Sequence, residues 1–283
     1  MLAPRQIIFT AVEGSLLDSA THSWAAAAEA LGELGRRLVP LVLVTRGTRA
    51  QLEPLRRKIE HTHPFITESG GAVFLPDGYF ALRLEGAVRA GRYFCVPFGR
   101  PYADAVAASE EIAEEAGASI VGYSQMNPRE IAGNTGEPVR EAEWARQREF
   151  SERFFFAGDA DGAASRFEEL ASRRGWKTVR GDPFWEIYSG NSEARALRYL
   201  MGLYRTSSKR ARLGSVAIGS TAEDSSLLSA ADHCVVLPRR GREFDPALVA
   251  LVPKAIPGET PGPAGWNQAV LQILENARSQ LQM

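Results

Sequence analysis

Short apolar runs alternate with longer amphipathic stretches at both ends of this chain, and this alternation limits its fold more than any other feature. Short runs bounded by turn residues predict buried strands, and longer stretches with helical spacing predict helices. Strands joined by crossover helices form a parallel sheet with helices on both faces. The sequence therefore predicts a Rossmann-like α/β core. The apolar runs are residues 7–10, 38–45, 215–220 and 233–238, and the helical stretches include 23–37 and 192–205.

The middle of the chain interrupts this alternation with helices and strands of its own. Helical spacing is found at residues 102–117 and 163–175, and each of these stretches is followed by an apolar strand signal, at 152–158 and 177–190. We therefore expect an inserted α+β unit. The predicted organisation is a first part of the core over residues 1–84, the insertion over 85–189, and a second part of the core over 190–283.

The overall charge excludes several classes of function. A formal net charge of -1 gives no general attraction for nucleic acid or for a membrane surface. The cysteines, Cys95 and Cys234, form no C-x-x-C pair, so neither a disulfide framework nor a thiolate zinc site is indicated. The first residues lack the regions of a signal peptide, and the longest apolar runs are too short to cross a bilayer. We expect a cytoplasmic protein that acts on a small molecule or a protein partner.

The loop after the first strand has the shape of a catalytic loop without a reactive group. In α/β proteins the chemistry usually lies where a strand runs into the following helix. In "FTAVEGSLLD" the strand is followed by Ala11, Val12 and Glu13 and then by Gly14. The position directly after the strand therefore offers a methyl group.

Several motifs carry a resemblance to a known family. In order, "FTAVEGSLLD", "LVLVTRGTRAQLE" and "AIGSTAEDSSLLSAADHCVV" resemble the first, second and fourth motifs of the haloacid dehalogenase-like (HAD) phosphatases. The segments "PFITESGGAVFLPDGYF", "NTGEPVREAEWARQREFSERF" and "PGPAGWNQAVL" resemble the mannosyl-3-phosphoglycerate phosphatases within that superfamily. The resemblance implies a HAD core with an inserted cap domain and a magnesium-dependent phosphatase that acts on a phosphate ester.

Four positions depart from the family's catalytic pattern. The phosphate-accepting aspartate aligns with Ala11, and the general acid/base aspartate aligns with Glu13. The lysine of the third motif aligns with Glu193, and a metal-binding aspartate of the fourth motif aligns with Ser220. Among the aligned catalytic positions, Thr45 and Asp224 keep the expected residue type.

These departures bear directly on phosphoryl transfer. An aspartyl-phosphate mechanism needs a carboxylate to attack phosphorus, and Ala11 has none. The family's Mg²⁺ prefers hard oxygen ligands, and here the remaining candidates are Glu13, Asp224 and Glu223. We therefore expect magnesium binding to be weak or lost. Glu193 places a carboxyl group where the family has an ammonium group that offsets the charge of the phosphate.

Residues that could still hold a ligand remain in both predicted units. After the second strand, Thr45, Arg46 and Gly47 are candidates for binding a phosphate. In the predicted cap, the resemblance places Arg148 and Arg180 in the region that faces the sugar and the glycerate carboxylate. The alternative is that these arginines hold the cap strands together, and both interpretations stay open. Nearby, Arg153 replaces a proline of the family pattern, which changes the turn and could change the ligand.

Two further motifs suggest chemistry on first inspection. A second D-x-D-G, residues 159–162, follows an apolar run, but a turn that caps the next helix near Asp161 is the favoured interpretation. His61 and His63 lie two residues apart, as a metal pair on a strand would, yet they follow a predicted helix and lack a third ligand nearby. A role at the end of that helix is the favoured interpretation.

Three hypotheses of function follow. The first is a pseudophosphatase that binds a phosphorylated glycerate or sugar-like ligand, or a protein partner, without turnover. The second is a weak or rerouted Mg²⁺-dependent phosphatase that acts on mannosyl-3-phosphoglycerate or a related ester. The third is an interaction protein that does not use its pocket. The four departures favour the first.

Overall fold

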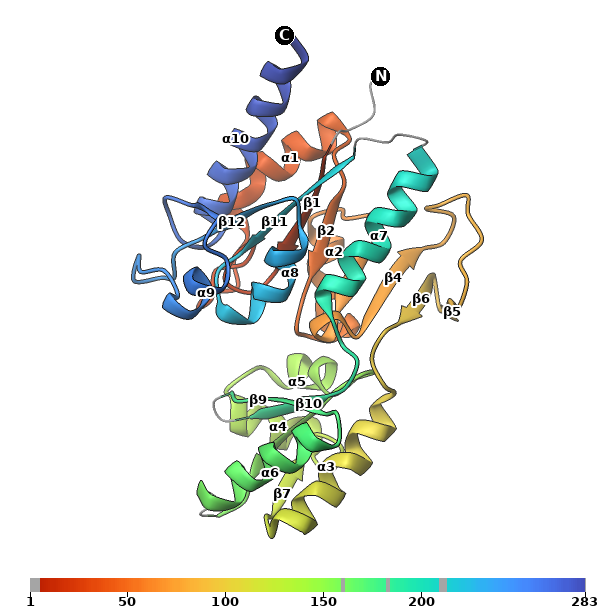
Figure 1. The fold of residues 1–283 in the computed structure, drawn as a ribbon, viewed down its shortest axis with the longest axis vertical. Coiled ribbons are helices and arrows are strands. Elements are labelled where there is room, and N and C mark those ends of the chain that lie inside the picture. Colours follow the sequence, from red (N-terminus) through yellow and green to blue (C-terminus); the bar gives the residue numbers. More distant parts are fainter. Residues whose placement is uncertain (1–5, 159–160, 182–183, 209–212, 283) are drawn as a thin grey trace.

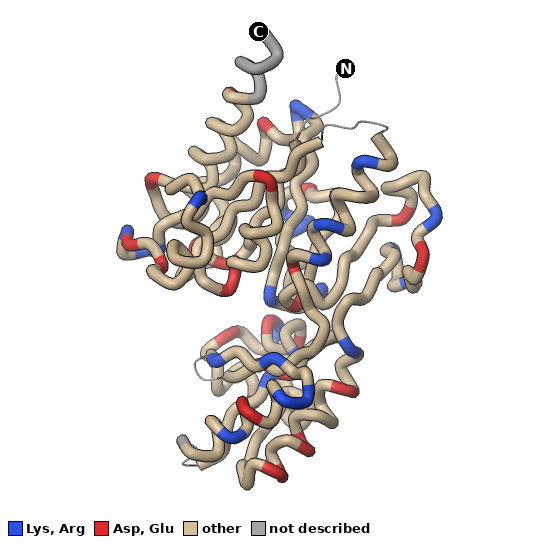
Figure 2. Tube along the Cα trace, in the orientation of Figure 1, with Lys and Arg blue, Asp and Glu red and all other residues tan. Residues whose placement is uncertain are grey.

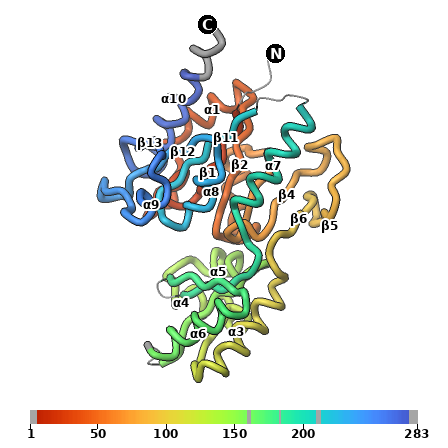
Figure 3. Tube along the Cα trace, in the orientation of Figure 1, coloured from red at the N-terminus to blue at the C-terminus, as the bar shows by residue number. Residues whose placement is uncertain are grey.

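The computed structural model describes residues 6–158, 161–181, 184–208 and 213–282. They form two units, one above the other along the long axis (Figure 1). The N-terminal and C-terminal parts of the chain lie side by side in the larger unit, and the middle of the chain forms the smaller one (Figure 3). The predicted α/β core with an inserted α+β unit is confirmed.

The larger unit is built on a sheet of nine described strands in the order β13-β12-β11-β1-β2-β3-β4-β6-β5. The six strands from β13 to β3 run parallel, and β4, β6 and β5 continue the sheet in antiparallel pairing. The strands are β1 (Gln6–Ala11), β2 (Leu41–Val44), β3 (Phe65–Thr67), β4 (Ala72–Pro76), β5 (Val88–Ala90), β6 (Tyr93–Pro97), β11 (Gly214–Gly219), β12 (His233–Val236) and β13 (Ile256–Pro257).

Helices cover both faces of the central strands, so β1 and β2 are buried on both sides. One face packs against α1 (Ala28–Arg37), α2 (Arg49–Lys58) and α10 (Gly262–Gln282) through Leu34, Leu52 and Trp266. The other face packs against α7 (Glu193–Ser208), α8 (Ser225–Ala230) and α9 (Pro246–Leu251). Three short 3-10 helices complete this unit: η1 (Ala25–Ala27), η2 (Glu68–Gly70) and η3 (Ala222–Asp224).

The smaller unit has a sheet of four described strands in the order β7-β8-β10-β9, with antiparallel pairing throughout. Its strands are β7 (Ile120–Gly122), β8 (Glu152–Phe156), β9 (Lys177–Val179) and β10 (Trp185–Tyr188). Helices α3 (Tyr102–Ala116) and α6 (Asp161–Arg173) pack against Phe154 and Ile187. Helices α4 (Pro128–Thr135) and α5 (Val139–Ala145) form a second small core with Tyr123 and Phe184.

Side chains of β8 and β10 alternate between these helices and the larger unit. Phe154 and Ile187 point into the core with α3 and α6, so Arg153 and Glu186, which are direct cross-strand neighbours, lie on the opposite face. This second face borders the space between the two units. We call the smaller unit the cap.

The cap begins later than the sequence analysis placed it. Strands β5 and β6 fall inside the range 85–189, yet they pair with each other and with β4 in the larger sheet. The cap elements start with α3 at Tyr102 and end with β10 at Tyr188. Two short connections join the units, and Arg100 N donates to Ser189 O at 2.8 Å between them.

A buried carboxylate of the larger unit anchors the cap. Glu68 in η2 accepts hydrogen bonds from Glu149 N at 2.8 Å, Phe150 N at 3.0 Å and Ser151 Oγ at 2.6 Å. Thr48, at the start of α2, adds a second link, because its Oγ1 donates to Trp144 O at 2.7 Å. These contacts fix the cap above the carboxyl ends of the central strands.

The remaining sequence motifs have structural roles or fall outside the described residues. His61 Nε2 lies 2.7 Å from Leu41 O, and His63 Nδ1 lies 2.7 Å from the Tyr79 hydroxyl. Burial lowers the pKa of His61 to about 3 and that of His63 to about 4, so both rings are neutral. Helix α6 begins at Asp161, but the turn at Asp159 lies outside the described residues.

Charged residues of both signs are spread over the two units (Figure 2). Within the described parts of the chain, no helix combines the length and the apolar character needed to cross a membrane.

Candidate functional site

A cleft of about 1140 Å³ lies between the cap and the larger unit. Its floor is formed by the loops that follow β1, β2 and β11, where ligands bind in open parallel sheets. Its opposite wall is formed by the cap sheet and α5. The sequence motifs that resemble the HAD pattern therefore meet at one place.

The loop after β1 reaches the floor without a nucleophile. Ala11 is the last residue of β1, lies between β2 and β11, and is buried. Glu13 and Gly14 line the cleft. Gly14 has a φ of 72°, and a Cβ there would lie 2.9 Å from Ser220 Oγ, so this glycine allows the loops after β1 and β11 to approach closely.

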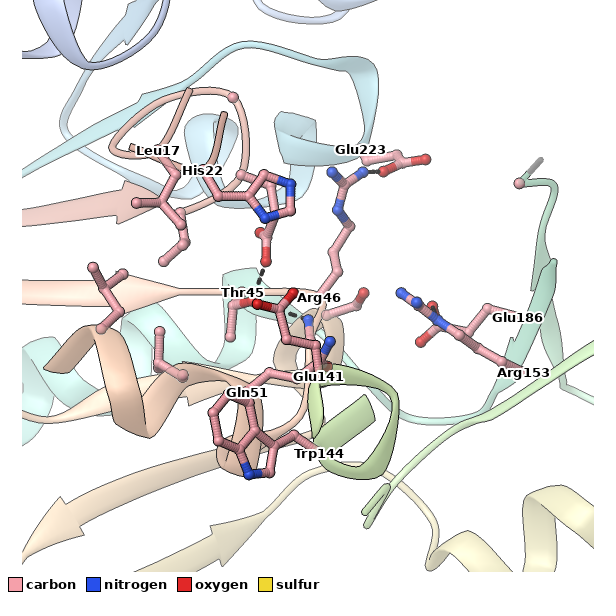
Figure 4. Close-up of a pocket in the computed structure, with 18 of the residues that line it drawn as sticks. Leu17, His22, Thr45, Arg46, Gln51, Glu141, Trp144, Arg153, Glu186 and Glu223 are labelled. Atoms are coloured by element: carbon pink, nitrogen blue, oxygen red, sulfur yellow. Dashed lines mark hydrogen bonds and ion pairs between the residues drawn. The ribbon is translucent and has the colours of Figure 1, made fainter. Parts of the chain in front are cut away.

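Thr45 uses its hydroxyl inside the protein. Its Oγ1 donates to Glu13 Oε1 and accepts the Gly47 backbone N–H at 2.9 Å (Figure 4). Glu13 and Thr45 follow two neighbouring strands, β1 and β2. The hydroxyl and the amide that a phosphate would use in this loop are therefore engaged with each other and with Glu13.

Arg46 crosses the floor and forms an ion pair with Glu223 (Figure 4). Both side chains are partly exposed. The pair connects the loop after β2 to η3, so the two residues lie on the same side of the cleft. The predicted phosphate-binding arginine thus already has an acidic partner.

Asp224 is held by the backbone of its own loop. Its Oδ2 accepts hydrogen bonds from Ser220 N at 2.7 Å and Thr221 N at 2.9 Å. Burial raises the pKa of Asp224, and these N–H groups counteract that rise. The hydrogen bonds give the carboxylate a clear structural role in shaping the turn after β11.

Glu193 begins α7 and is buried, with 6% of its surface exposed. Burial raises its pKa to about 8, with a further rise from the charges of Asp224 and Glu13 and a decrease from Arg46 and Lys177. The carboxyl group is therefore mainly protonated at neutral pH, whereas the sequence analysis treated it as a negative charge. Among the described residues, neither Glu193 Oε2 nor the buried Ser220 Oγ has a hydrogen-bond partner.

The residues of the floor do not fit a magnesium ion. Magnesium needs several hard oxygen ligands in near-octahedral geometry. Glu13 is bonded to Thr45, Glu223 is paired with Arg46, and Asp224 Oδ2 accepts two backbone N–H groups. The part of the chain that the structure describes contains no group of three histidine, cysteine or acidic side chains that could hold a metal ion.

The cap wall places basic side chains opposite this floor. Arg153, Lys177 and Arg180 line the cleft together with Glu186 and Tyr188. Arg153 Nε lies 3.4 Å from Glu186 Oε2, and Figure 4 shows the Arg153 side chain pointing into the cleft. Although burial raises it, the charges of Arg148 and Arg153 hold the pKa of Glu186 below its ordinary value.

The two predicted cap arginines have different environments. Arg148 is not among the residues that line the cleft, and its guanidinium is fully buried. Its Nη2 donates to Glu186 Oε1 at 2.6 Å and to Ser151 Oγ at 2.5 Å, which are contacts that hold the cap together. Arg180 lines the cleft, but its Nη2 also donates to Glu168 Oε2 at 2.6 Å.

Lys177 is a cleft residue that the sequence analysis overlooked. Lys177 is distant in sequence from Glu193 and reaches the cleft from β9 of the cap. The pairing of β9 with β10 places Lys177 opposite Tyr188 and on the same face as Glu186, and this register is a property of the folded sheet.

Comparison with known proteins agrees with this geometry. No protein-family model matches the chain. A haloacid dehalogenase-like hydrolase from Bacteroides thetaiotaomicron superposes with a TM-score of 0.62 at 17% identity, covering 95% of this chain and 99% of that chain. A HAD subclass IIB sugar phosphatase superposes with a TM-score of 0.63 at 15% identity, covering 95% and 98%. The fold is that of the HAD hydrolases.

Two relatives narrow the class to a family. The glucosyl-3-phosphoglycerate/mannosyl-3-phosphoglycerate phosphatase of Methanococcoides burtonii is 31% identical over 95% of this chain and 97% of its own length. The protein of the same description from Persephonella marina is 29% identical over the same shares of the two chains. The chain belongs to the mannosyl-3-phosphoglycerate phosphatase family of HAD proteins.

Proposed function

We propose that this chain binds a phosphorylated glyceric acid glycoside of the kind named for its relatives and does not hydrolyse it through an aspartyl phosphate. The ligand class is supported by the two relatives, whose descriptions name glucosyl- and mannosyl-3-phosphoglycerate. The main observation in favour of lost turnover is that Ala11 stands at the end of β1, where the floor of the cleft also contains Glu13, Glu193 and Asp224.

A methyl group at this position removes the covalent step. Nucleophilic catalysis divides phosphate-ester hydrolysis into two easier reactions, and it requires an oxygen nucleophile aimed at phosphorus. Ala11 has no such atom, and no other carboxyl group takes its place at the end of β1 in the described structure. Glu13 belongs to the same loop but its carboxylate is bonded to Thr45.

Direct attack by water is poorly supported by the same residues. A general base contributes about 10²–10⁴-fold to a rate, far less than the acceleration that phosphate-monoester hydrolysis requires. Two candidate bases are present. Glu13 accepts a hydrogen bond from Thr45, and Asp224 accepts hydrogen bonds from the backbone of the loop after β11. Among the described lining residues of the loops after β1, β2 and β11, Arg46 is the only lysine or arginine that could neutralise the developing charge.

A binding measurement combined with product analysis tests the proposal. The purified chain is titrated with mannosyl-3-phosphoglycerate and glucosyl-3-phosphoglycerate by isothermal calorimetry, and the mixture is then analysed for free phosphate. We expect saturable binding of at least one of them with the ligand recovered intact. Steady phosphate release would favour a rerouted phosphatase, and absence of binding would favour an interaction protein; either result contradicts the proposal.

A further inference from the structure

We propose that the phosphate of the bound ligand is held by the cap, between Arg153 of β8 and Lys177 of β9, instead of by the floor of the cleft. This inference rests on the proposed function, because it assigns the recognition residues for the same phosphorylated ligand. It reverses the expectation that Thr45, Arg46 and Gly47 bind the phosphate.

The floor offers few free donors to a phosphate. The Gly47 N–H donates to Thr45 Oγ1, the Thr45 hydroxyl donates to Glu13, and Arg46 is paired with Glu223. An incoming dianion would need to break these contacts before it could form its own. The polar groups at the end of β2 are therefore already satisfied by the protein.

The floor is also acidic. Glu13, Asp224 and Glu223 contribute carboxylates around a single arginine, and the carboxyl group of Glu193 lies among them. Like charges a few ångströms apart repel strongly when they are partly buried. A phosphate at the floor would face this repulsion without the lysine and metal ion that offset it in the family pattern.

Arg153 is well placed to bind an anion from the cap side. Its side chain is 28% exposed and points into the cleft (Figure 4). Glu186 orients it through Nε, and the hydroxyl of Tyr123 makes a further hydrogen-bonding contact. Because Glu186 is also bonded to the buried Arg148 at 2.6 Å, its charge is shared between two guanidinium groups.

Lys177 supplies a second cation on the same face. It is the direct cross-strand neighbour of Tyr188, and its Nζ lies 5.6 Å from the centre of that ring. Its side chain is exposed in the cleft, and the described residues include no ion pair that engages it. Lys177 lines the cleft, and its charge lowers the pKa of Glu193 on the floor.

Together the two residues provide the chemistry of a phosphate site. An arginine binds phosphate through a planar fork of N–H groups, and a lysine adds a compact positive charge. Held on the cap, the phosphate stays away from Ala11 and from the acidic floor. The sugar and the glycerate portion then occupy the space between the cap sheet and the loops after β1 and β2.

Calorimetric titration with 3-phosphoglycerate in the presence of EDTA tests this assignment. The natural chain is compared with Arg153→Gln and Lys177→Gln, and Lys254→Gln, at an exposed lysine that is not among the residues lining the cleft, is the matched control. We expect each cap variant to weaken binding by about 10-fold or more, which is typical for loss of one charge-assisted contact. Lys254→Gln should bind as the natural chain does.

The second arm separates the floor from the cap and the phosphate from the carboxylate. Arg46→Gln is titrated in the same way, and inorganic phosphate and glycerate compete with the ligand. A larger loss in Arg46→Gln than in either cap variant, or competition by glycerate alone, overturns the inference while leaving the proposed function intact. If the natural chain binds neither 3-phosphoglycerate nor the glycosylated ligands, both proposals are wrong. Lys177→Gln keeps the test valid if Arg153→Gln fails to fold, because Lys177 is an exposed side chain.

Discussion

At the scale of single residues, the site combines buried acids with very little neutralising charge. Glu193 is the clearest case, because burial and the neighbouring Asp224 and Glu13 all oppose its ionisation. A lysine at this position would neutralise the same neighbours. The glutamic acid avoids the repulsion by keeping its proton, so its chemical character at neutral pH is that of a neutral hydrogen-bonding group.

This character predicts how stability depends on pH. The pKa of Glu193 is about 8 in the folded protein and near its ordinary value of 4.5 in the unfolded chain. The folded state therefore binds the proton more tightly, and its stability falls as the pH rises through this window. Glu193→Gln should remove that loss. Its free energy of unfolding should therefore rise relative to that of the natural chain by roughly 2–4 kcal/mol between about pH 5 and about pH 8.5.

Urea unfolding of both proteins across this range is the measurement. Glu141→Gln, at a lining residue of α5, serves as the control for the loss of a carboxylate. A natural chain whose stability relative to Glu193→Gln stays constant from acid to alkaline pH would show that Glu193 ionises normally.

The sequence identified which residues gather at the site, but not how they pair. The resemblance to the HAD motifs implied that Glu13, Thr45, Glu193, Ser220 and Asp224 lie at one site. The bonds from Thr45 to Glu13 and from Arg46 to Glu223 join distant segments, and pairing of this kind depends on the packed structure. Patterns along the chain carry no information about it.

At the scale of elements, long periodic segments were predicted and short ones were missed. The strands β1, β2, β11 and β12 and the helices α1, α3, α6 and α7 fall where the apolar patterns placed them. The helices and strands absent from the prediction include α4, α5, α9, β5, β6, β7 and β13, each of eight residues or fewer. Segments of this length span about two turns of helix at most, so their periodicity is too brief to recognise.

The junction between η2 and α7 is an element contact that positions Glu193. Gly70 has a φ of 85°, and a Cβ there would lie 2.2 Å from the backbone N of Glu193. Gly70→Ala should therefore combine backbone strain with a clash and cost about 3 kcal/mol or more. Thermal and urea unfolding measure the loss.

Gly78→Ala is the matched control for this substitution. Gly78 also has a positive φ, 73°, but a Cβ there would meet nothing within 4 Å. It should cost only the backbone strain, about 1 kcal/mol. Equal losses in the two variants would show that the close approach of η2 to α7 contributes nothing to stability.

At the scale of the whole molecule, the chain keeps the architecture of the HAD hydrolases. The sheet, the cap and the position of the cleft follow the HAD pattern that the motifs indicated. The cap starts later than the predicted residue 85, because β5 and β6 extend the larger sheet by antiparallel pairing. Strand β5 has three residues, most of them exposed, so it has no apolar pattern that would indicate which sheet it joins.

The most direct test of this account is phosphate release from mannosyl-3-phosphoglycerate in the presence of magnesium. The natural chain is compared with a variant that carries Ala11→Asp, Glu13→Asp, Glu193→Lys and Ser220→Asp, after circular dichroism has shown that both are folded. We expect no release by the natural chain and measurable release by the restored variant. Release by the natural chain at an enzyme-like rate would contradict the account and would place a new mechanism at Glu13 and Asp224.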